Sequence, residues 1–159
     1  MDEKMKILIT DDNNEIIKIM KRQIEKYPKF EIVGICQDIE KEKSMIENLK
    51  PNVVITNIRK NKEWTGLNII EEYKQREDKP IFCVVSASAT IFLKEMQKIG
   101  VRYYLDKPYL EEDFIRMLTN IYNEIYPRDI VIKRSEMTET TKQNHINYFF
   151  RQIKKRIGT

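Results

Sequence analysis

Short apolar runs alternate with longer amphipathic stretches five times between about residues 5 and 126. The runs are residues 7–9, 30–36, 53–55, 80–85 and 101–105, and their near-continuous apolar character is typical of strands buried on both faces. The first amphipathic stretch has apolar residues at helical spacing: Ile16, Ile17, Met20, Ile24 and Tyr27. Five β–α units of this kind predict an α/β fold with a five-stranded parallel sheet, doubly wound, so that helices cover both faces.

Three residues mark the expected ends of helices. Asn13 stands where its side chain can cap the first helix. Pro51 ends the second helix, expected over residues 39–49, because the residue before a proline disfavours helical backbone. Gly100 ends a helix expected from about Thr90 to Ile99, since glycine is common just after a helix.

Composition indicates a soluble, cytoplasmic protein. A chain of 159 residues can bury one sizeable core, and 34% charged residues imply a well-solvated surface. A net charge of +4 permits an acidic partner without demanding nucleic acid. Cys36 and Cys83 lie in apolar runs, which indicates buried reduced thiols. We find no apolar segment long enough for a signal peptide or a membrane span, so we expect no membrane contact.

Polar residues follow the predicted strands. Asp11 and Asp12 follow the first, Asn57 the third, Ser86 the fourth and Lys107 the fifth. Ligands bind outside the carboxyl ends of the strands in sheets of this kind, so we expect these side chains to share one site. Adjacent carboxylates suit Mg²⁺, although an Asp-Asp pair alone also occurs in surface turns. A lysine before a proline, such as Lys107, is equally uninformative alone, and so is a serine after a strand, such as Ser86. The prediction therefore depends on finding all of these residues at successive strand ends.

As a set, these stretches resemble the receiver domain of bacterial two-component response regulators over about residues 5 to 126. The stretches that carry the resemblance are Lys6 to Asp12, Val53 to Arg59, Gly66-Leu67, Val84 to Ala87 and Tyr104 to Pro108. The resemblance implies the flavodoxin-like receiver fold for residues 1–126. Residues 127–159 are then a linker and a C-terminal amphipathic helix.

The resemblance also implies roles for individual residues. Asp12 would bind Mg²⁺ directly, Asp11 through water, and the backbone carbonyl of Arg59 would supply another ligand. Lys107 would pair with the acceptor side chain and the phosphoryl group, and Ser86 would bind a phosphoryl oxygen.

Tyr104 would turn inward on activation by the same resemblance. The alternative for Tyr104 is an aromatic side chain packed at a strand edge.

The departure from the family pattern is at the acceptor, which is Asn57 where the family has aspartate. A neutral amide oxygen is a poor nucleophile, so phosphorylation should stop. Loss of one anion near a cation removes about 1 kcal/mol of attraction in water and about 4 at an effective dielectric of 20, so Mg²⁺ should bind weakly if at all. Either Asn57 is natural and the domain is a pseudo-receiver, or an ordinary receiver was mutated. Lys60-Asn61, where the family has Met-Pro, favours the first explanation.

The tail leaves two interpretations open. An apolar stripe predicts a helix that packs on its own receiver or in a homodimer: Ile146, Phe149, Phe150, Ile153 and Ile157. Alternatively, it is a fragment of a DNA-binding output that regulates transcription, with four cations facing phosphates: Arg151, Lys154, Lys155 and Arg156. With four glycines and no phosphate-cradling loop, the sequence gives no sign of an enzyme. We expect a signalling module that acts by protein–protein contact, with a histidine kinase among its candidate partners.

Overall fold

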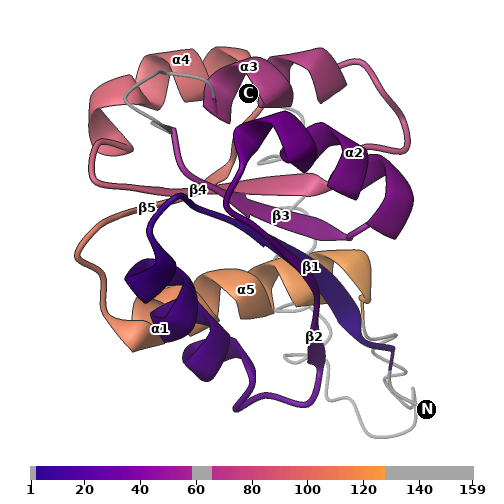
Figure 1. Cartoon of the computed structure of the whole chain (residues 1–159), viewed down its shortest axis with the longest axis vertical. Coiled ribbons are helices and arrows are strands. Elements are labelled where there is room, and N and C mark those ends of the chain that lie inside the picture. The colour runs from indigo at the N-terminus through magenta and orange to yellow at the C-terminus, as the bar shows by residue number, and fades with distance from the viewer. Residues whose placement is uncertain (1–2, 59–65, 128–159) are drawn as a thin grey trace, which may run out of the picture. The chain divides into compact units, whose positions relative to one another are not determined.

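The computed structural model describes residues 3–58 and 66–127, in which strands and helices alternate along the chain (Figure 1). The predictions for Arg59, Lys60 and the tail helix lie outside these residues. The described elements, in chain order, are β1 (Met5–Thr10), α1 (Asn14–Ile24), β2 (Phe30–Cys36), α2 (Ile39–Leu49), β3 (Val53–Thr56), α3 (Gly66–Tyr73), β4 (Ile81–Ser86), the 3₁₀ turn η1 (Thr90–Phe92), α4 (Leu93–Lys98), β5 (Tyr103–Asp106) and α5 (Glu111–Ile125).

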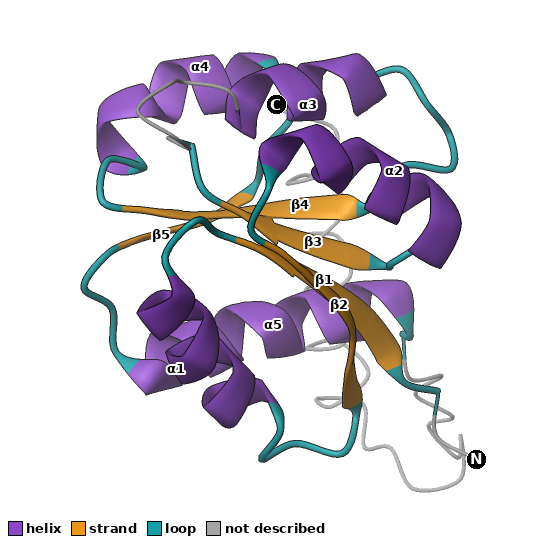
Figure 2. Ribbon diagram, in the orientation of Figure 1, coloured by secondary structure: helices purple, strands orange, loops and turns teal. Residues whose placement is uncertain are grey.

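The five strands form one parallel sheet in the order β2-β1-β3-β4-β5, which confirms the predicted fold class. Helices α1 and α5 cover one face of the sheet, and α2, α3 and α4 cover the other (Figure 2). Side chains alternate between the faces along each strand, so Ile7 and Ile9 of β1 pack with α1 and α5, whereas Leu8 packs with the opposite layer. Burial on both faces explains why the strands read as continuous apolar runs.

The expected helix ends are confirmed in detail. The Asn13 side chain accepts hydrogen bonds from the backbone N–H of Glu15 at 3.0 Å and of Ile16 at 3.4 Å, which caps α1. Gly100 has φ of +86°, a backbone conformation that a residue with a Cβ adopts only with strain. The helix expected over residues 90–99 is divided into η1 and α4, because Phe92 leaves the helical region with φ −100° and ψ 21°.

Both cysteines are buried and free, as expected. Burial away from water raises the pKa of the Cys83 thiol well above its usual range, so this group stays protonated. In the described part of the chain, no helix combines the length and the apolar character that crossing a membrane requires.

Candidate functional site

The site lies at the point where the chain reverses its direction across the sheet. From β1 the chain goes to β2 on one side, and it then returns to β3 on the other side of β1. In sheets of this topology a crevice opens at the carboxyl ends of the two strands that flank the reversal. Asp11 follows β1 and Asn57 follows β3, so both border this crevice. Ser86 at the end of β4 and Lys107 after β5 lie at the same edge of the sheet.

Asp11 and Lys107 form an ion pair inside the protein. The Lys107 ammonium donates to Asp11 Oδ2 at 2.5 Å, and the two side chains are 15% and 1% exposed respectively. The backbone N–H of Asn13 donates to the other carboxylate oxygen at 2.9 Å. The resemblance led us to expect the side chain at position 57 as the partner of Lys107. The structure shows Asp11 as a partner of Lys107, and a carboxylate attracts an ammonium more strongly than a neutral amide does.

Asn57 is half-buried and lies against the start of α3. A Cβ atom at Gly66 would overlap the carbonyl oxygen of Asn57, so only glycine permits this close approach. The Gly66 backbone N–H also donates to the carbonyl of Ile58 at 3.1 Å. Gly66 therefore allows the start of α3 to lie directly against the backbone of Asn57 and Ile58.

Ser86 is connected to Lys107 through the backbone. The Ser86 carbonyl accepts from the Lys107 N–H at 2.9 Å, and the buried Ser86 hydroxyl accepts from the N–H of Ser88 at 3.3 Å. On the neighbouring edge strand, Tyr104 is 36% exposed. Asp106 accepts hydrogen bonds from the Thr90 hydroxyl and backbone N–H, which lower the pKa of its carboxyl and fix the start of η1.

The donor set suits a hard cation only in part. Asp11 is buried and Asp12 is exposed, and two carboxylates at one strand end are oxygen ligands of the kind that Mg²⁺ prefers. Across residues 3–58 and 66–127, no three Asp, Glu, His or Cys side chains gather as a metal-binding group. The predicted third ligand, Arg59, lies outside the described residues. A cation at Asp11 would also compete with the Lys107 ammonium.

One group close to the site was missed by the sequence reasoning. Glu42 in α2 is fully buried, and its carboxylate accepts hydrogen bonds from Thr10 and Thr56, the residues that precede Asp11 and Asn57. A signal was present, because Glu42 stands four positions before the buried Ile46 and so shares its helix face.

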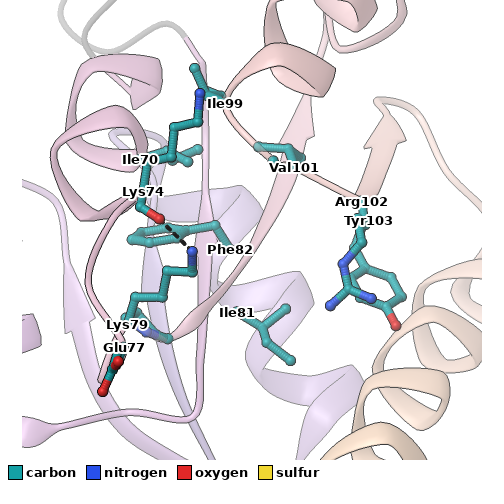
Figure 3. A pocket seen from close by; sticks show the side chains of 12 residues that line it. Ile70, Lys74, Glu77, Lys79, Ile81, Phe82, Ile99, Val101, Arg102 and Tyr103 are labelled. Carbon is teal, nitrogen blue, oxygen red and sulfur yellow. Dashed lines mark hydrogen bonds between the residues drawn. The ribbon is translucent and has the colours of Figure 1, made fainter. Parts of the chain in front are cut away.

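A pocket of about 370 Å³ lies away from these residues, beside the amino ends of β4 and β5 (Figure 3). Its apolar lining includes Ile70, Phe82 and Val101, and at its rim the Lys79 ammonium donates to the Lys74 carbonyl at 2.5 Å. None of the predicted site residues lines this pocket. It lies at the amino ends of the strands, whereas the predicted site residues lie at the carboxyl ends.

Comparison with known proteins identifies the family. Residues 7–119 match the model of the response regulator receiver domain. The chain is 24% identical over 131 residues to the response regulator protein GraR of Staphylococcus epidermidis, which covers 82% of this chain and 57% of that protein. It is 25% identical over 122 residues to GraR of Staphylococcus aureus, with 77% and 53% covered. The chain therefore spans about half the length of the curated relatives it matches.

Solved structures show the same fold. The response regulator domain of Thermotoga maritima CheB superposes with a TM-score of 0.67 at 17% identity, over 76% of this chain and 98% of that one. The response regulatory domain of mrkE from Klebsiella pneumoniae gives a TM-score of 0.69 at 22% identity, over 76% and 97%. Because the family match extends from β1 into α5, the chain belongs to the response regulator receiver domains of two-component signal transduction.

Proposed function

We propose that this receiver does not accept phosphate at position 57 and that it signals through protein–protein contact. The observation that carries the proposal is Asn57, which directly follows β3 at the crevice where the family carries its acceptor aspartate. An acyl phosphate forms when a carboxylate oxygen attacks phosphorus. The amide oxygen of Asn57 bears no full charge and is a far weaker nucleophile. The domain is then a pseudo-receiver and not an enzyme.

The charges of the site are balanced within the protein, without a bound metal ion or phosphoryl group. The Asp11–Lys107 ion pair satisfies a buried carboxylate from within the protein. Magnesium bound here would be held by Asp12 and Asp11, with a carbonyl oxygen of Asn57 or Arg59, and would supply positive charge toward an incoming phosphoryl group. We infer weak magnesium binding, because Asp11 has an internal cation partner and position 57 contributes no carboxylate. Ser86, Lys107 and Tyr104 keep their proposed phosphoryl and switch roles only where position 57 carries a carboxylate.

The partners that fit this function are other signalling proteins. A histidine kinase that docks on the receiver without transferring phosphate is one, and a second copy of the chain, docked through the tail helix, is another. Relatives of this family include RcsB of Salmonella, which was solved bound to promoter DNA. The alternative function is a receiver with a DNA-binding segment in the tail, in which the basic residues at positions 151 and 154–156 would face phosphates and not simply solvent. Either function belongs in the cytoplasm.

A phosphate mimic tests the proposal. RcsB was solved with phosphomimetic BeF₃⁻, and a mimic of this kind needs an acceptor carboxylate to bind. With Mg²⁺ present throughout, we expect added BeF₃⁻ to leave the NMR spectrum of the parent chain unchanged and to cause large shifts at Ser86 and Lys107 in Asn57→Asp. Shifts of equal size in the parent chain would contradict the proposal.

A further inference from the structure

Helix α2, which covers one face of the sheet (Figure 2), carries a buried carboxylate, Glu42, behind the candidate site. Glu42 is 0% exposed, and its Oε1 accepts hydrogen bonds from the hydroxyls of Thr10 at 3.1 Å and Thr56 at 3.2 Å. A carboxylate is removed from water only at a large free-energy cost unless hydrogen bonds replace its hydration. Two hydroxyl donors on one oxygen provide such bonds, so the three side chains form one polar unit inside an otherwise apolar layer.

The two threonines stand where the backbone ladder between β1 and β3 stops. The paired residues of these strands are Ile7 with Val53, Leu8 with Val54 and Ile9 with Ile55. Thr10 and Thr56 are the next residues along the two strands. Glu42 therefore connects β1 and β3 one residue beyond their last backbone pair. The residues that follow are Asp11 and Asn57.

The outer sides of both strands remain paired at this level. Thr10 of β1 pairs with Cys36 of β2, and Thr56 of β3 pairs with Val84 of β4. Each half of the sheet is thus held by its own backbone bonds up to the crevice. Between the halves, the Thr10 hydroxyl contacts the Ile55 carbonyl of β3 directly at 3.1 Å, and the Glu42 carboxylate adds a second connection through Thr10 and Thr56.

Side-chain contacts with α3 hold helix α2, which carries Glu42, in place. Lys43 forms an ion pair with Glu72 of α3. One turn further along α2, Glu47 accepts a hydrogen bond from the Tyr73 hydroxyl at 2.5 Å and forms an ion pair with Arg76. These contacts lie one helical turn apart on the side of α2 that faces α3, and the position of Glu42 follows from that of α2.

We propose that Glu42 is a positioning residue of this site, which clamps the ends of β1 and β3 through Thr10 and Thr56 and thereby sets the spacing of Asp11 and Asn57. The inference rests on the proposed function in so far as this crevice is the working site of the chain. It adds a residue outside the acceptor, metal and switch positions.

Matched variants separate the clamp from simple packing. Thr10→Ser with Thr56→Ser keeps both hydroxyls and loses two methyl groups. Glu42→Leu with Thr10→Val and Thr56→Val removes the three polar side chains together, so that none of the three is left without the other two, and the Thr10 contact with the Ile55 carbonyl is lost with them. Two backbone amides of unchanged residues report on the crevice: Asn13, which donates to Asp11, and Gly66, which lies against the Asn57 carbonyl. Magnesium affinity is measured by calorimetry in the full chain and in Asn57→Asp.

The clamp predicts that the apolar triple variant folds, that its Asn13 and Gly66 amide signals both move, and that its magnesium affinity in the Asn57→Asp background falls about tenfold. The serine variant should match the parent in all three respects. Equal signals and equal affinity in the two variants would overturn the clamp. Should the triple variant fail to fold, Thr56→Val is compared with Thr56→Ser, and identical reporters in that pair overturn it equally. A parent chain that takes phosphate contradicts the proposed function but leaves this comparison intact.

Discussion

Replacing Lys107 by methionine tests the electrostatics of the site. The variant removes the ammonium from a carboxylate that is 1% exposed, while the methionine keeps most of the side-chain volume. Removing one partner of a buried pair costs about 3 to 5 kcal/mol, because the remaining charge is left uncompensated. Lys107 is 15% exposed and Asp11 retains the Asn13 N–H, so we expect the low end of this range, about 3 kcal/mol.

An exposed ion pair of similar length is the control. Lys26 and Glu111 are 2.6 Å apart, with side chains 57% and 38% exposed. Lys26→Met should cost less than about 1 kcal/mol, because water screens exposed pairs. The measurement is urea unfolding at neutral pH with a chelator present, with the free energy of unfolding taken for each variant.

A double variant shows whether the loss comes from the orphaned charge. Asp11→Asn with Lys107→Met removes both charges and should recover most of the free energy of unfolding lost in Lys107→Met alone. Excess magnesium should stabilise Lys107→Met more than the parent, because Asp11 is then free for the cation. The reasoning is refuted if Lys107→Met costs no more than Lys26→Met, or if the double variant recovers nothing.

Three further predictions can be tested, the first from the structure and the last from the sequence of the tail. Gly66→Ala should destabilise the protein by about 1 to 3 kcal/mol in urea unfolding, because its Cβ would overlap the Asn57 carbonyl; an unchanged midpoint would contradict this. Magnesium titration followed by Trp64 fluorescence should give a weaker affinity for the parent than for Asn57→Asp, and equal affinities would refute the electrostatic argument. Phe149→Asp with Phe150→Asp should give a smaller particle in light scattering if the tail forms a dimer; monomers of equal stability in both forms would favour the DNA-binding interpretation instead.

Local patterns were sufficient to predict the fold. The apolar runs give strands because both faces of the sheet are covered, and Asn13 and Gly100 mark helix ends through properties of their own side chains and backbone. The break at Phe92 was missed, since a continuous helical pattern does not reveal a local change of backbone angles. The apolar pattern alone does not predict the order of the strands in the sheet; only the family resemblance does.

The site was predicted as a set of strand ends but not as a set of contacts. Which carboxylate Lys107 selects depends on distances and charges that arise only after folding. Glu42 was missed for a related reason: a glutamate in a charged helix is normally exposed, and its two threonine partners are far away in the sequence. The spacing of Glu42 to the buried Ile46 indicates its helix face, but nothing local indicates that Thr10 and Thr56 are its partners.

Intact mass after incubation with acetyl phosphate and magnesium tests the central claim most directly. The account predicts no phosphoryl addition to the parent chain, and addition of one phosphoryl group to Asn57→Asp at the restored aspartate. Phosphorylation of the parent chain at a residue of the crevice would contradict the claim that this receiver has lost its acceptor. Failure of Asn57→Asp to react would contradict the claim that Asp12, Ser86 and Lys107 remain arranged for phosphoryl transfer.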